Sequence, residues 1–300
     1  MGSDAFAVPS LESLARIHEV IAVVTQPDKP AGRAKILAPT PLKLSAEKLG
    51  LKILQPLRCR DETFIRELRA LAPETIVVVA YGQILPKEIL TLPPRGCINV
   101  HASLLPRWRG ASPVAHAILN GDTVTGVTTM MMDEGLDTGP ILLQREETIF
   151  SADTTANLET RLAKIGAELL LETPAHSPSP NPQDNAKSTH APKLKKEDGR
   201  IDWSLTAEQI ERRVRAFNPW PTAFTFAGKT RLQIWSAKVL PENGSAGIVA
   251  RADKGGITVG TGEGILLITE LQREGSRRMA AAEFLRGFRL EVGQRLGAEK

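Results

Sequence analysis

The chain has 300 residues, 42% of them hydrophobic and 24% charged, which is enough for one large core or two ordinary ones and excludes global disorder. Its longest apolar runs, such as residues 75–80 and 264–269, are far shorter than the roughly 20 residues that cross a bilayer, so no transmembrane segment is expected. The first residues lack a basic region followed by an apolar one, which excludes a secretory signal and makes a cytoplasmic protein the expectation.

The net charge of +4 is unevenly distributed along the chain. Residues 193–300 carry 19 Lys and Arg against 13 Asp and Glu, a net of +6, whereas the first 192 residues carry 19 against 21, a net of −2. A basic C-terminal part beside a near-neutral N-terminal part suits a polyanionic partner. A solvated surface would give the same count, so the charge alone leaves the partner open.

Short β-branched runs alternate with helical patterns in the first half of the chain. We expect strands at residues 20–24, 51–54, 75–80 and 97–101, and helices at residues 39–49 and 62–71. This order predicts a parallel α/β sheet. Residues 76–79 are all apolar, which is typical of a strand covered on both faces. Two further strands are expected at residues 126–132 and 140–146, joined by the loop of residues 133–139.

The second half of the chain changes character. A long helix with a stripe of apolar residues around Leu158 and Leu162 is expected first, with Thr154 or Thr155 to cap it. Prolines among polar residues from Pro174 onward then predict a linker. A helix over 207–217 and five short alternating runs predict a small antiparallel, OB-like barrel, with the runs at residues 222–226, 230–234, 247–250, 256–261 and 265–270.

Candidate catalytic residues lie at the end of one strand and in one loop. Asn99 and His101 are two residues apart on the strand of residues 97–101, so their side chains share one face at its carboxyl edge. Asp137 lies in the glycine-punctuated loop of residues 133–139. A carboxylate beside an imidazole holds one tautomer and suits proton transfer. Taken singly, the pair also fits a hydrogen-bonded core pair and the Asp a turn residue.

Two segments together carry a more specific pattern. Residues 96–110 read Gly-Cys-Ile-Asn-Val-His-Ala-Ser-Leu-Leu-Pro-Arg-Trp-Arg-Gly, and residues 135–139 read Gly-Leu-Asp-Thr-Gly. This pattern resembles the formyltetrahydrofolate-dependent formyltransferases. Further segments resemble the members of that family that act on methionyl-tRNA, namely residues 25–33, 81–86, 200–204 and 216–221. The resemblance covers nearly the whole chain and implies a Rossmann-like catalytic domain over 1–172, a linker over 173–199 and a tRNA-binding barrel over 200–300.

The resemblance also implies an activity, in which a formyl group passes from 10-formyltetrahydrofolate to the amino group of methionine on initiator methionyl-tRNA, for translation initiation. The amine would attack directly, through a tetrahedral intermediate. Asn99 and His101 would stabilise its oxyanion, and Asp137 would orient His101 and take up the proton that the amine loses. The residues implied for the folate donor are Tyr81, Gly82, Ile84, Leu85, Ser103, Leu104, Leu105 and Pro106.

The implied tRNA contacts are basic residues in two places. They are Lys29, Arg33 and Lys35 in the loop of residues 27–36, and Arg212 and Arg213 on the expected C-terminal helix. A mobile basic loop and a solvated helix face are the alternatives. The five histidines show no paired ligand spacing, so we expect no metal. Cys59 and Cys97 form no Cys-x-x-Cys pair, so we expect reduced thiols. We also expect a monomer.

One departure from the family concerns the first strand. Residues 1–9 match the turn that normally follows an apolar opening strand, so we expect that strand to be missing, with a start assigned too late as the explanation. Two rival functions stay open. One is a formyltransferase with a small amine acceptor, such as a nucleotide sugar or a ribonucleotide, and the other is an RNA-binding module that has lost catalysis.

Overall fold

The computed structural model of the protein describes residues 1–31, 36–176 and 179–297, and the chain forms two compact units. The first unit comprises Met1–Pro113, Val124–Thr148 and Glu159–Pro192. The second comprises Val114–Thr123, Ile149–Leu158 and Lys193–Lys300. The first unit therefore includes residues 179–192, which the sequence analysis places in a linker.

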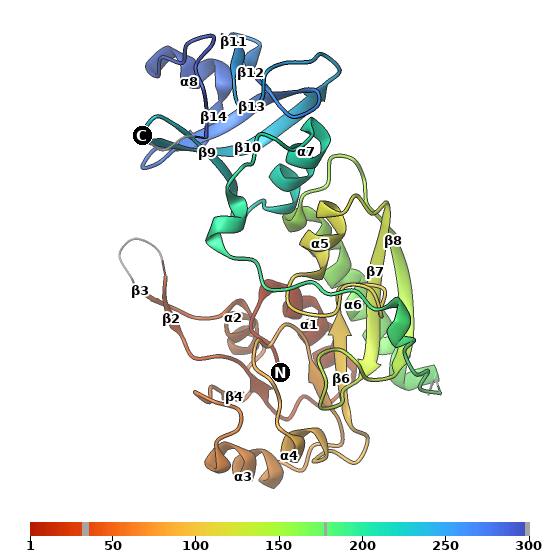
Figure 1. The fold of residues 1–300 in the computed structure, drawn as a ribbon. Helices are drawn as coiled ribbons and strands as arrows, with labels where there is room; N and C mark the ends of the chain where they lie inside the picture. The colour runs from red at the N-terminus through yellow and green to blue at the C-terminus, as the bar shows by residue number, and fades with distance from the viewer. Residues whose placement is uncertain (32–35, 177–178, 298–300) are drawn as a thin grey trace. The chain divides into compact units, whose positions relative to one another are not determined.

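Helices and strands alternate through the first unit, as the sequence predicts (Figure 1). Up to the candidate strand they are η1 (Ala5–Ala7), α1 (Val8–Ile17), β1 (Val23–Val24), β2 (Lys29–Ala31), β3 (Ile36–Ala38), α2 (Pro41–Lys48), β4 (Ile53–Leu54), α3 (Glu62–Ala70), β5 (Ile76–Val78), α4 (Lys87–Leu90) and β6 (Cys97–His101). The later elements are β7 (Val124–Met131), β8 (Ile141–Thr148), α6 (Thr155–His176, with Thr155–Leu158 in the second unit) and η2 (Asn185–Lys187). The predicted Rossmann-like α/β class is confirmed.

The strand pairing of this unit is parallel in part. β1 pairs with β4, and β5 pairs with β6, both in parallel as predicted. β7 and β8 run antiparallel to their neighbours, in the order β5-β6-β7-β8. The β6–β7 register sets Asn99 opposite Met130 and His101 opposite Thr128. The candidate side chains therefore lie at the carboxyl end of β6, where an α/β sheet usually carries its site.

A gap separates β1 from β5, which belong to separate sheets in the described strand pairing. Met1 and Gly2 bridge it: the amino group of Met1 donates to the carbonyl of Val77 at 2.6 Å, and the amide of Gly2 donates to the carbonyl of Val24 at 2.9 Å. Next to Met1, between β1 and β5, lies a cavity of about 930 Å³ that is also lined by residues of α1, α3 and α6. The two parts of the sheet are thus joined only at the level of these first residues within the described pairing.

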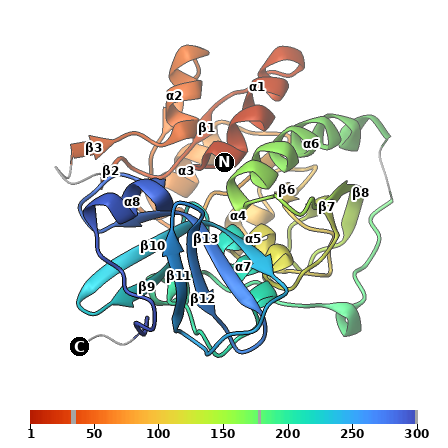
Figure 2. The ribbon, with the colours of Figure 1, turned by 90° about the horizontal axis from the view of Figure 1, so that it is seen from above.

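The second unit is built around an antiparallel sheet with its own apolar core (Figure 2). Its strands run in the order β11-β12-β13-β10-β9, with β14 beside β13, while α7 packs on β10 and α8 on β13. The predicted antiparallel C-terminal domain is confirmed. The elements are α5 (Pro113–Leu119, with Pro113 in the first unit), η3 (Lys196–Gly199), α7 (Ala207–Ala216), β9 (Ala223–Ala227), β10 (Thr230–Leu240), β11 (Val249–Asp253), β12 (Gly256–Gly260), β13 (Ile265–Arg273), β14 (Met279–Ala280) and α8 (Ala281–Gly287).

Side-chain caps explain where the main helices begin. Thr40 accepts a hydrogen bond from the amide of Lys43 at the start of α2, and Thr206 forms a capping box with Gln209 at the start of α7. At α6 the side chain of Asn157 accepts the amide proton of Thr154 at 2.8 Å. No helix in the described part of the chain combines the length and apolar composition needed to cross a membrane.

Glu159, near the start of α6, has an unusual environment. Burial, and secondly the charge of Asp4, raises the pKa of Glu159 from 4.5 to about 7. Between pH 4.5 and 7 the folded chain binds more protons at Glu159 than the unfolded chain does. The stability that protonated Glu159 contributes is therefore complete at low pH and is lost as the pH rises through 7. Above that pH the ionised side chain costs roughly 3 kcal/mol, because each unit of pKa shift corresponds to about 1.4 kcal/mol.

We therefore expect Glu159→Gln to stabilise the protein by roughly 3 kcal/mol at pH 8 and to have little effect at pH 4.5. Urea unfolding of both proteins across this range measures the difference. The exposed Glu88 on α4 provides a matched control, since Glu88→Gln should change stability little at either pH. An equal effect of Glu159→Gln at both ends of the range would contradict the assigned titration.

Candidate active site

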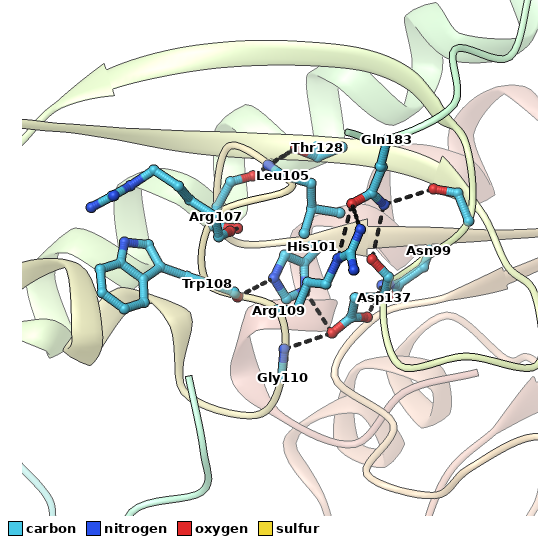
Figure 3. A network of polar contacts seen from close by, with 12 residues as sticks. Asn99, His101, Leu105, Arg107, Trp108, Arg109, Gly110, Thr128, Asp137 and Gln183 are labelled. Carbon is cyan, nitrogen blue, oxygen red and sulfur yellow. Dashed lines mark hydrogen bonds and ion pairs between the residues drawn. The ribbon is translucent and has the colours of Figure 1, made fainter. Parts of the chain in front are cut away.

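Three side chains from distant parts of the sequence converge at the carboxyl end of β6 (Figure 3). The amide Nδ2 of Asn99 donates to Oδ1 of Asp137 at 3.4 Å. The Nδ1 atom of His101 lies 3.7 Å from Oδ2 of the same carboxylate. The expected amide, imidazole and carboxylate are therefore within mutual reach. Their side chains are sheltered, with that of His101 7% and that of Asp137 15% exposed.

The orientation of the His101 ring follows from a backbone contact. Its Nε2 atom lies 2.9 Å from the carbonyl oxygen of Trp108. A carbonyl can only accept, so Nε2 carries a proton and donates it. Nδ1 is then the ring nitrogen that faces Asp137, with Oδ2 3.7 Å away.

Asp137 itself has a strained backbone. Its φ of 54° lies in the left-handed region, which costs most L-residues about 1–2 kcal/mol and which Asp tolerates better than bulkier residues. The amide of Gly110 donates to its Oδ2 at 2.8 Å. Strain of this kind is retained where the surroundings impose it, and it concentrates at functional sites.

The turn after β6 is built by buried polar side chains. The hydroxyl of Ser103 donates to the carbonyl of Arg107 at 2.6 Å, and the hydroxyl of Thr128 donates to the carbonyl of Ser103 at 2.6 Å. The amide of Leu105 donates to that same Thr128 oxygen at 3.1 Å. Ser103 and Leu105 are buried, so their side chains hold the turn, whereas Leu104 and Pro106 are half-exposed.

The loop of residues 81–86 lies beside the Asp137 loop. Lys87, the residue that follows this loop, forms an ion pair with Glu134 at 3.0 Å, and both side chains are largely exposed. Ile84 is 86% exposed and Leu136 is 59% exposed, one large apolar side chain on each loop.

The other predicted residues of the loop of residues 81–86 divide by accessibility. The side chains of Tyr81 and Leu85 are buried in the core, and burial raises the pKa of the Tyr81 phenol. The Tyr81 carbonyl accepts a hydrogen bond from Nε2 of Gln26 at 2.7 Å. Gly82 is exposed. The accessible members of the expected folate set are therefore Gly82, Ile84, Leu104 and Pro106.

The predicted tRNA contacts fall in both units. Lys29 is exposed on β2, with Nζ at Oε1 of Gln26. Arg33 and Lys35 lie outside the described residues. Arg212 pairs with Glu208 at 3.4 Å, and the guanidinium of Arg213 lies 5.9 Å from the centre of the Phe217 ring.

Sequence reasoning missed three contributors to the site. Gly110, whose amide donates to Asp137, and Arg109, which donates to Gln183, lie within the quoted motif, but nothing in their type indicates these contacts. Gln183 lies among the prolines interpreted as a linker, where a single amide carries no chemical signature. In the described part of the chain, His, Cys, Asp and Glu form no cluster of three that could hold a metal ion. The metal-free site stays a prediction.

The comparisons with known proteins define the class. The formyl transferase family model matches residues 8–173, and the model of the formyl transferase C-terminal domain matches residues 193–289. The chain therefore belongs to the formyl transferase family. Its relatives include proteins named methionyl-tRNA formyltransferase from Geobacter sulfurreducens, 48% identical over 99% of this chain and 95% of that protein, and from Thermodesulfovibrio yellowstonii, 47% identical over 97% and 96%.

Solved structures support the same fold. A methionyl-tRNA formyltransferase from Clostridium thermocellum matches with a TM-score of 0.53 and 27% identity, covering 65% of this chain and 82% of that chain. The sugar 3N-formyl transferase WlaRD, solved with dTDP and 5-N-formyl-THF, matches with a TM-score of 0.68 over 92% of this chain and 97% of that chain. At 20% sequence identity, this match is evidence for the fold alone.

Gly139 closes the Asp137 loop against the backbone of β7. A Cβ atom added there would lie 1.9 Å from the carbonyl oxygen of Met131, so the loop would have to shift. We expect Gly139→Ala to lower the turnover number about 100-fold, since a displacement of about 1 Å at a catalytic group has effects of this size.

Steady-state formyl transfer with the full-length variant measures this effect. The matched control is Gly287→Ala on α8, where an added Cβ meets nothing within 4 Å and the turnover number should stay as in the wild type. A Gly139→Ala enzyme that turns over at the wild-type rate would show that the loop position does not matter.

Proposed function

We propose that this chain transfers a formyl group from 10-formyltetrahydrofolate to the amino group of methionine on initiator methionyl-tRNA. The convergence of Asn99, His101 and Asp137 carries this proposal. An amide donor, an imidazole and a carboxylate are the groups that attack of an amine on a carbonyl carbon needs: stabilisation of a negative oxygen and a place for a proton. The relatives named for this reaction match nearly the whole chain.

The formyl donor would bind over the loop of residues 81–86 and the Asp137 loop. The exposed Ile84 and Leu136 side chains supply apolar cover that a flat ring system requires, and the exposed backbone of Gly82 allows close approach. When bound, the donor supplies the carbonyl carbon that is attacked. The buried members of the predicted set, Tyr81, Leu85, Ser103 and Leu105, would shape this surface from beneath, and the accessible Leu104 and Pro106 would complete it.

Asn99 is the group best suited to the developing oxyanion. Its contact with Asp137 is long at 3.4 Å, so one amide proton can turn toward a stronger acceptor at small cost. Because Nε2 of His101 is engaged by Trp108, the hydrogen bond that His101 donates would have to come from Nδ1.

Asp137 would take up the proton that the attacking amine loses. Its Oδ2 keeps the hydrogen bond from the Gly110 amide, which holds the carboxylate in place during the transfer. Oδ1 has the weaker contact and is therefore the oxygen to which the proton would pass. No covalent bond to the protein is required.

Two observations support tRNA as the acceptor of the formyl group: the positive charge of the C-terminal part and the names of the relatives. The C-terminal unit is basic, and Arg212 and Arg213 would contact the phosphate backbone while Lys29, Arg33 and Lys35 would meet the acceptor end. Transferases with a small amine acceptor share the fold, as the match to a sugar 3N-formyl transferase illustrates. They form the second candidate function, which an acceptor comparison tests directly.

Single replacements of the three central residues test the proposal. We expect Asn99→Ala, His101→Ala and Asp137→Asn each to lower the turnover number about 100-fold or more, because each removes a group that acts on the transition state. Labelled formyl donor with charged initiator tRNA gives the rates, and Asn120→Ala on the exposed end of α5 serves as the control. Unchanged rates in all three variants would refute the site.

The proposed tRNA contacts can be tested by the salt dependence of KM for tRNA. We expect Lys29→Ala and Arg213→Ala to raise KM for tRNA while leaving the turnover number near the wild-type value. Each variant should also reduce the dependence of log KM on log salt concentration by about one unit if it removes one phosphate contact. An unaltered salt slope in both variants, or transfer to a nucleotide sugar that outpaces transfer to tRNA, would argue against this assignment.

A further inference from the structure

Gln183 contacts the Asp137 loop although it is 46 residues away in sequence. Its amide Nε2 donates two hydrogen bonds, one to the carbonyl of Asp137 at 2.8 Å and one to the carbonyl of Gly139 at 2.7 Å (Figure 3). An amide nitrogen has two protons, so both are used. One side chain thus fixes two carbonyl groups on the same loop.

One of these carbonyls belongs to the residue at the bend that aims the carboxylate, and the other lies two residues after it. Asp137 has the left-handed φ of 54°, and Gly139 follows where the chain passes the backbone of β7. Side-chain direction follows backbone conformation, so relaxation of residue 137 toward an ordinary φ would turn its carboxylate away from Asn99 and His101. Gln183 supplies contacts that oppose this relaxation.

Arg109 determines which way the Gln183 amide faces. Its guanidinium donates to Oε1 of Gln183 from Nε at 3.1 Å and from Nη2 at 2.7 Å, and Nη2 also donates to Oδ1 of Asn185 at 2.8 Å. A guanidinium has only donors, so the atom beside it must be the amide oxygen, and the amide nitrogen must face the loop. Arg109 is 5% exposed, which favours a fixed position.

The backbone around Arg109 links the same segments. The amide of Arg109 donates to the carbonyl of Thr189 at 2.9 Å, and the amide of Ala191 donates to the carbonyl of Arg109 at 2.7 Å. The next amide, that of Gly110, donates to the Asp137 carboxylate. Residues 109 and 110 therefore hold Asp137 in two ways: Gly110 holds its side chain, and Arg109 holds its backbone through Gln183.

We propose that Gln183 is a positioning residue for formyl transfer, and that Arg109 acts through it. Gln183 holds the backbone of Asp137 in the left-handed bend that directs the carboxylate at Asn99 and His101. This inference rests on the proposed function for its kinetic readout, but its structural content concerns the bend alone.

Gln183→Glu is the sharpest single test. The carboxylate keeps the two acceptor contacts with Arg109 but has no proton to offer the carbonyls of Asp137 and Gly139. We expect the turnover number to fall about 10- to 100-fold, the usual range for the loss of a supporting contact, while KM for the formyl donor and for tRNA changes less than about threefold. If Gln183→Glu does not fold, Gln183→Met removes the same donors without adding charge.

Asn185→Ala is the matched control, because it removes the other acceptor of Arg109 and leaves both donations from Gln183 in place. We expect it to retain turnover within about threefold of the wild type. A Gln183→Glu or Gln183→Met enzyme that is folded and turns over like Asn185→Ala would overturn the proposal.

A double-mutant cycle separates positioning from a general structural role. If Gln183 acts through Asp137, adding the Gln183 replacement to Asp137→Asn should slow the enzyme less than about twofold further. Losses that multiply would overturn the inference. A crystal structure of Gln183→Met tests the bend itself: φ of residue 137 outside the left-handed region supports the inference, and an unchanged φ overturns it. Absence of turnover in the wild type would instead refute the proposed function.

Discussion

The carboxylate of Asp137 is the group on which the arrangement of the site depends. Its two oxygens accept hydrogen bonds from the Asn99 side chain and from the backbone amide of Gly110. The Nδ1 atom of His101 lies 3.7 Å from Oδ2. These partners come from β6 and from the turn that follows it, whereas Asp137 belongs to the loop between β7 and β8. A sheltered carboxylate needs such donors, so the loop, the turn and the strand edge are each stable in this position only when the others are present.

Strand register is the next constraint. β6 and β7 pair antiparallel with His101 opposite Thr128, and β7 leads directly into the Asp137 loop. A slip by one residue would turn Asn99 and His101 to the other face and bring Ile98 and Val100 to the site. Thr128 also anchors the turn after β6 by hydrogen bonds at both Ser103 and Leu105. The pairing that builds the sheet therefore also sets the distance between imidazole and carboxylate.

Much of this architecture could be predicted from the sequence, because it depends on local patterns. The apolar run 76–79 indicates one strand, the β-branched residues within 97–101 indicate another, and alternation with helices indicates the α/β class. The motif around Asn99 and His101 indicates the site. The antiparallel direction of β7 and β8 was not predicted, since hydrophobic pattern does not distinguish strand direction. The contact of Gln183 with the loop is set by tertiary packing of a proline-rich segment, for which no local signal exists.

The use of an amide between Arg109 and the Asp137 loop has a chemical consequence. A guanidinium paired directly with the carboxylate would occupy both of its oxygens and oppose any proton arriving there. Gln183 instead accepts from Arg109 and donates only to backbone carbonyls, so the positive charge fixes the bend without engaging the carboxylate. Oδ1 of Asp137 is left with only the long contact to Asn99. This oxygen can therefore accept a proton while the Asn99 amide turns to the oxyanion.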